Sequence, residues 1–181
     1  MRTRLAFAAA VLAVASLAAG CGSDDSETSS AEEWAGSVCT AVSTWTDSLR
    51  ESLGSITAGN VSEDALRSAA DDAKSATDTL VDDLRGLGKP DTEAGEQAQS
   101  SVEQLADDLR EQADKIESAA NDASGVSGVL GAVSTVTGAL GQMSTAVSST
   151  VSDLEKLDAQ GELRQAFENA APCQDLQSSN S

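Results

Sequence analysis

Large apolar side chains recur at intervals of three or four residues along most of this chain, which is the spacing of amphipathic α-helices. Four such stripes follow one another after residue 30, separated by short breaks that contain glycine, proline or asparagine. The first three stripes predict helices that begin near residues 31, 60 and 90. A shorter apolar pattern at residues 163–167 predicts one further short helix near the C-terminus.

The fourth stripe begins in a segment of different composition, residues 123–152, which contains no charged side chain and is about one third serine and threonine. A segment of this length could cross a membrane. Its apolar residues, however, keep a helical register, which predicts a helix that buries one face. A membrane-inserting or loosely ordered segment is the alternative. The stripe comprises Val126, Val129, Val133, Val136, Leu140, Met143, Val147, Val151, Leu154 and Leu157.

Four helices with short connections favour antiparallel neighbours. The sequence therefore predicts an all-α fold: an up-down four-helix bundle over residues 31–173, with a short C-terminal helix and one disulfide. Cys39 lies about two turns into the first helix, and Cys173 follows the last. An even number of helices brings both cysteines to one end of the bundle, where they can bond. Residues 174–181 are polar and are expected to form a disordered tail.

The N-terminus has the layout of a bacterial export signal. Two arginines in the first four residues precede an uncharged run at residues 5–17, which is too short to span a bilayer. Small residues at 18–20 then precede Cys21, an arrangement that resembles the lipobox of bacterial lipoproteins. The family usually has Leu, Val or Ile three residues before the cysteine, where this chain has Ala18. The alternative is an ordinary secretory signal that leaves Cys21 as a free thiol.

The resemblance implies that residues 1–20 are a signal peptide and that Cys21 carries diacylglycerol. The chain would then be anchored in the cell membrane by lipid, on the extracytoplasmic face. Residues 21–30 are expected to form a flexible acidic tether that holds the domain about 17 Å from the lipid. The Trp34-x3-Val38-Cys39 start of the first helix resembles uncharacterised small lipoproteins of high-GC actinobacteria, and this second resemblance implies no activity.

Composition excludes several classes of function. From Cys21 onward the chain has nine basic and 30 acidic residues, a formal charge of −21. Nucleic-acid binding needs a basic face, which this chain lacks, so we expect no nucleic-acid partner. Histidine and tyrosine are absent. Because the commonest general base and metal ligand are missing, we expect a protein that is not an enzyme and has no cofactor or metal.

Two groups of residues have competing interpretations. Asp71, Asp78 and Asp82 share one helical face, which could form a loose calcium site but is more typical of a solvated acidic face. Trp34 and Trp45 are three helical turns apart and could anchor a partner. Residues at this spacing more often belong to a hydrophobic core.

The uncharged segment is the stronger candidate for an interaction surface, because it offers no electrostatic repulsion to another copy or to an envelope protein. Its candidate residues are Val126, Val129, Thr135, Met143 and Ser144. The leading hypothesis is a non-catalytic lipoprotein that acts as a surface interaction or structural module. The alternative is a lipoprotein that holds an apolar ligand between its helices, which would require an enclosed cavity of a few hundred Å³.

The anchor hypothesis predicts that Cys21→Ala releases the protein from the membrane fraction into the medium or periplasm, because the two acyl chains would be lost. Cell fractionation and immunoblotting measure this. Retention of the variant in the membrane fraction would show that Cys21 is not the anchor.

Overall fold

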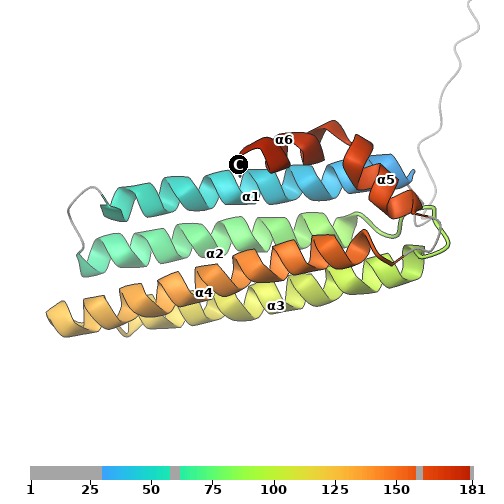
Figure 1. Cartoon of the computed structure of the whole chain (residues 1–181). Coiled ribbons are helices and arrows are strands. Elements are labelled where there is room, and N and C mark those ends of the chain that lie inside the picture. The colour runs from blue at the N-terminus through green and yellow to red at the C-terminus, as the bar shows by residue number, and fades with distance from the viewer. Residues whose placement is uncertain (1–29, 58–61, 158–160, 180–181) are drawn as a thin grey trace, which may run out of the picture.

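Six α-helices account for nearly all of the residues that the computed structural model describes, 30–57, 62–157 and 161–179 (Figure 1). The proposed signal peptide, Cys21 and the tether up to residue 29 lie outside these ranges. The helices are α1 (Ala31–Thr57), α2 (Glu63–Gly86), α3 (Gly95–Asn121), α4 (Gly125–Leu154), α5 (Glu162–Asn169) and α6 (Ala171–Ser179).

The four long helices alternate in direction, and each packs along the next one in the chain (Figure 1). The α4 helix packs mainly on α3 and only slightly on α2, whereas α1 contacts α5 and α6 in addition to α2. The predicted all-α, up-down bundle is therefore confirmed. The C-terminal part differs in detail, because it forms two short helices that fold back over α1 where the sequence predicted one.

Side-chain caps fix where the first two helices begin. The Ser30 hydroxyl accepts a hydrogen bond from the Glu33 backbone N–H and donates one to the Glu33 carboxylate, which together form a capping arrangement. Ser30 thus caps α1, although the sequence assigned it to the tether. At α2, the Ser62 hydroxyl accepts a hydrogen bond from the Ala65 N–H. Both helices therefore start where polar residues satisfy otherwise unpaired N–H groups.

Both tryptophans belong to the hydrophobic core. Trp34 donates its indole N–H to the Gly88 carbonyl at 3.1 Å and packs edge-to-face on Phe167, with ring centroids 6.2 Å apart. Trp45 donates to the buried Thr77 hydroxyl at 3.1 Å. Each bulky ring thus buries its apolar surface and still satisfies its one polar group. The core interpretation is correct, and neither ring is available to a partner.

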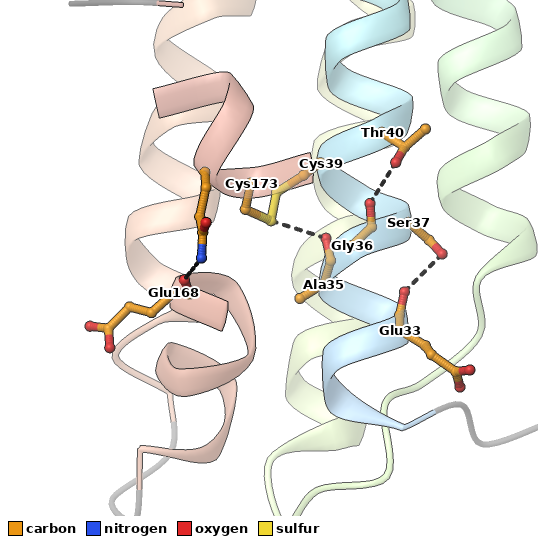
Figure 2. Close-up of a disulfide and its surroundings, with 9 residues drawn as sticks. Glu33, Ala35, Gly36, Ser37, Cys39, Thr40, Glu168 and Cys173 are labelled. Carbon is orange, nitrogen blue, oxygen red and sulfur yellow. Dashed lines mark hydrogen bonds between the residues drawn. A yellow bond between two sulfur atoms is a disulfide. The ribbon is translucent and has the colours of Figure 1, made fainter. Parts of the chain in front are cut away.

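The predicted disulfide between Cys39 and Cys173 is present, with Cα atoms 5.1 Å apart (Figure 2). Both residues are buried between α1 and α6. The Cys173 sulfur also lies 3.4 Å from the Ala35 carbonyl oxygen. This is a polar contact without a hydrogen bond, because a sulfur in a disulfide has no proton to donate. The bond fixes the first turn of α6 against α1.

The expected disordered tail at residues 174–181 is wrong over most of its length, because α6 continues to Ser179. The sequence of this region is polar apart from Leu176, which is half-buried and packs against the core. Disulfide attachment at Cys173 and this one apolar contact hold a segment whose composition alone does not predict a helix.

A polar cluster ties the start of α4 to the start of α2. The Gly125 backbone N–H donates to a Glu63 carboxylate oxygen at 2.7 Å, and Arg67 lies 3.6 Å from the same carboxylate. Arg67 also donates to the Ala123 carbonyl at 3.4 Å. A carboxylate at a helix N-terminus satisfies unpaired N–H groups and complements the helix dipole. Glu63 therefore fixes the position of α4 at the end of the bundle far from the disulfide.

Removal of the disulfide should lower stability without changing the helical fold. The bond joins positions 134 residues apart, and a loop of this size stabilises the folded state by about 5 kcal/mol in the chain-entropy model. Cys39→Ser combined with Cys173→Ser should lose up to about this amount in urea unfolding. The oxidised and reduced wild-type protein should also differ in mobility on gels, and equal mobility would show that the bond does not form.

Glu63→Ala should destabilise the bundle by about 1 kcal/mol, as the loss of a helix cap does. Asp64→Ala is a matched control, because it removes the same charge from the same turn but leaves the bond to Gly125 in place. Urea unfolding of both variants measures the difference. Equal destabilisation would show that Glu63 acts only through its charge on α2.

Candidate functional site

The α4 helix has two faces of contrasting character. One face is buried, mainly against α3, through residues spaced by three, four or seven positions: Val129, Ala132, Val136, Ala139, Met143, Val147 and Leu154. The prediction of a helix that buries one face is confirmed. The opposite face is exposed, and it has no charged side chain from residue 125 to residue 152. We call this exposed surface the neutral face.

The structure divides the five predicted surface residues into two groups. Val126, Thr135 and Ser144 are exposed on α4. Val129 and Met143 are 8% and 1% exposed, so their assignment to the surface is wrong. They are two complete heptads apart, and so they lie on the same side of the helix, in the stripe that faces the rest of the bundle. Apolar character in this segment therefore marks the buried stripe as well as the surface.

The sequence interpretation did not single out Leu130, which is 66% exposed, next to Val126 at 80%. Among the described residues these are the large apolar side chains with the greatest exposure, and both lie in the first two turns of α4. Leu130 interrupts the spacing of the main stripe, because it directly follows Val129. This displacement was the available signal that Leu130 points away from the core.

Hydroxyl groups on α4 are partly satisfied within the helix itself. Thr135, Thr137 and Thr145 each donate to the backbone carbonyl four residues earlier, at 3.2, 2.8 and 2.8 Å. A hydroxyl with such a bond needs fewer partners from water, which lowers the free-energy cost of covering it. The neutral face is therefore less polar than its count of serines and threonines suggests.

Three glycines on this helix are not explained by packing against the described residues. A Cβ atom added at Gly131, Gly138 or Gly141 would meet nothing within 4 Å. Each glycine costs about 1 kcal/mol of helix stability relative to alanine. The helix carries this cost at three positions where no neighbouring segment needs the space.

Several acidic residues of α2 and α3 form ion pairs with basic residues of the other helix. Lys74 lies 3.2 Å from Asp114 and 3.5 Å from Asp78, and Arg110 lies 3.7 Å from Asp78. The hydrogen bond to Asp114 raises the pKa of Lys74 above its ordinary value, against the lowering effect of burial, and Asp78 raises it further. The ion pairs of Lys74 with Asp114 and Asp78 therefore stabilise the fold while Lys74 is protonated. This stabilisation is lost as the pH rises through the raised pKa of Lys74.

Of the predicted acidic face Asp71, Asp78 and Asp82, the last two form ion pairs with α3. Asp78 pairs with Lys74 and Arg110, and Asp82 lies 3.4 Å from Arg110. In the described parts of the chain, no three carboxylate or cysteine groups come close enough to hold a metal ion. The arrangement supports a solvated acidic face crossed by ion pairs.

Several hollows flank α1, including an open depression of about 600 Å³ between the start of α1 and the start of α6, and two others differ in character. The first is apolar, with a volume of about 80 Å³, and lies beside the disulfide, where Val38, Val42, Val151, Phe167 and Leu176 line it. The second is an open polar groove between α1 and α2, with a volume of about 540 Å³. Its walls include Glu51 and Asp72, both exposed, and the hydroxyls of Ser48, Ser52, Ser75 and Thr79. Exposed carboxylates in an open groove lack the sheltered apolar surroundings of a catalytic acid.

By length and composition, α4 is also the one helix among the described residues that could cross a membrane. In this structure 28% of its most apolar window is buried in the bundle.

Comparison with known proteins does not assign this chain to a family. No family model matches the sequence, and no curated protein or solved structure shows significant similarity to it.

Proposed function

We propose that this chain is a non-catalytic, lipid-anchored lipoprotein of the cell envelope that acts as a surface interaction or structural module. In this proposal diacylglycerol on Cys21 holds the chain at the extracytoplasmic face of the membrane, and the neutral face of α4 contacts the partner. The partner is an envelope protein or another copy of the chain.

One observation carries the proposal: Val126 and Leu130 are exposed on a helix whose outer face has no charge. The rest of the mature chain is strongly acidic. Exposed apolar side chains grouped together on a soluble domain are typical of contact surfaces. An uncharged surface can also contact another protein without the free-energy cost of desolvating carboxylates. The neutral face thus combines the two properties that a protein contact needs.

The orientation of the bundle supports the same function. The start of α1 lies at one end of the bundle, with Cys39 about two turns along it, and the start of α4 lies at the other end (Figure 1). A tether that ends at residue 30 would place the first of these ends next to the membrane. Val126 and Leu130 would then stand at the far end, where other envelope components can reach them.

The composition supports a function without catalysis. The whole chain has no histidine or tyrosine, so the serine and threonine hydroxyls that line the open groove have no histidine beside them to act as the usual activating base, and the two lining carboxylates are exposed. A binding role needs none of these groups.

A lipoprotein that holds an apolar ligand is the second candidate. The apolar hollow beside the disulfide has a volume of about 80 Å³, whereas ligand pockets usually enclose about 300 to 1,000 Å³. The hollow has room for a few methylene groups and not for a lipid. The exposed neutral face therefore favours the interaction module over the ligand carrier.

The proposal predicts that Thr137→Glu, which places a charge on the neutral face, reduces recovery of envelope partners at least tenfold. A buried unpaired charge costs several kcal/mol, and about 1.4 kcal/mol corresponds to a factor of ten. The measurement is affinity isolation of the full lipidated chain from its own membranes after chemical cross-linking, with bound proteins quantified by mass spectrometry.

Thr44→Glu on α1 is the matched control. Thr44 is also exposed, and its hydroxyl also donates to the carbonyl four residues earlier. Both variants should keep the wild-type circular dichroism and melting temperature. Equal partner recovery from the two variants would contradict the proposal. A stoichiometric non-covalent lipid in the purified wild-type protein would favour the ligand carrier instead.

A further inference from the structure

The neutral face continues beyond its apolar end along most of α4, as far as residue 152. Leu130 and Ser148 are both exposed and are separated by 18 residues, which is five complete helical turns. They therefore occupy the same side of the helix, about 27 Å apart. Exposed Ser134, Thr137, Gly141 and Ser144 lie between them at steps of three or four residues. This is the heptad spacing of a helix that packs along a second helix.

Charge restricts which partner this surface fits. An oppositely charged protein would be attracted to the acidic residues of α2 and α3, which lie outside the neutral face. The electrostatic complement of an uncharged surface is another uncharged surface. This chain carries such a surface itself, and α4 is the described helix on which two copies can meet without bringing carboxylates together.

The small side chains of this surface suit close approach of two helices. Gly138 and Gly141 leave open space outside α4, and the Thr137 hydroxyl is already bonded to Val133. Small residues at a helix–helix contact allow the two backbones to come close together. A second α4 would also cover Leu130, which is exposed in the single chain.

We propose that the neutral face of α4 pairs with the neutral face of α4 in a second copy, with the two helices parallel. The pairing rests on the proposed function, because copies anchored in one membrane through Cys21 would have the same orientation relative to that membrane. Anchoring also raises the local concentration of copies, which favours weak pairing. In a parallel two-fold pair, Leu130 meets Leu130 of the other copy and Ser148 meets Ser148.

Site-directed cross-linking of the full lipidated chain in its own membranes tests this arrangement. Leu130→Cys and Ser148→Cys, made separately, should each give a disulfide-linked dimer on non-reducing gels after mild oxidation. Ser37→Cys, an exposed serine on α1, is the control and should give at least tenfold less dimer. Addition of Thr137→Glu to Leu130→Cys should reduce the dimer band at least tenfold, because two like charges would face each other.

The outcomes separate the alternatives. In an antiparallel pair, position 130 would meet position 148, so a dimer that forms only in a mixture of the two cysteine variants would overturn parallel pairing. Absence of dimer in both single variants and in the mixture would overturn self-pairing at this face. The proposed function would survive that result if Thr137→Glu still removed other envelope partners, and it would fail if partner recovery did not change.

Discussion

The covalent bond between Cys39 and Cys173 is the constraint on which the arrangement of the chain ends depends. The α5 and α6 helices are short, and isolated helices of this length are marginal in water. Attachment at Cys173 converts α6 into a neighbour of α1, and Phe167 of α5 packs against Trp34 on the same side. The bundle therefore joins the start of its first long helix to the segment that follows its fourth.

Charged residues are distributed unevenly over the bundle. The α2 and α3 helices carry acids and bases along their shared edge, where Lys74 and Arg110 bridge the two helices. Exposed ion pairs of this kind contribute modestly to stability. The α4 helix has no such pairs between residues 125 and 152. It is held by its buried stripe and by the contact of Glu63 with Gly125.

Packing of the buried stripe explains how the glycine-rich α4 remains helical. The intrinsic helix propensity of α4 is poor, and glycine at positions 131, 138 and 141 makes it poorer. Burial of the opposite face compensates, because tertiary packing supplies most of the stability of helices in proteins. The outer face is then free to consist of small, uncharged residues. That freedom is what makes α4 a candidate for contact with a second α4.

The spacing of apolar residues determined a large part of this fold in advance. Helix starts near residue 31 and residue 60, the antiparallel order and the joining of Cys39 to Cys173 all follow from local periodicity and from an even number of long helices. These features depend on interactions that repeat every turn, and a sequence records such repetition directly. The core positions of Trp34 and Trp45 follow from the same pattern.

Tertiary structure decided which side of α4 is covered, and the sequence carried only the displacement of Leu130 from the main stripe as a signal of the outcome. Val129 and Leu130 are adjacent and similar in hydrophobicity, yet Val129 is buried and Leu130 is exposed. The exposure of the two side chains differs because α3 covers only one side of α4. The position of α3 is set in turn by its packing against α2. The helical end of the chain has the same origin, since the pattern of residues 174–179 predicts no helix without the bond at Cys173.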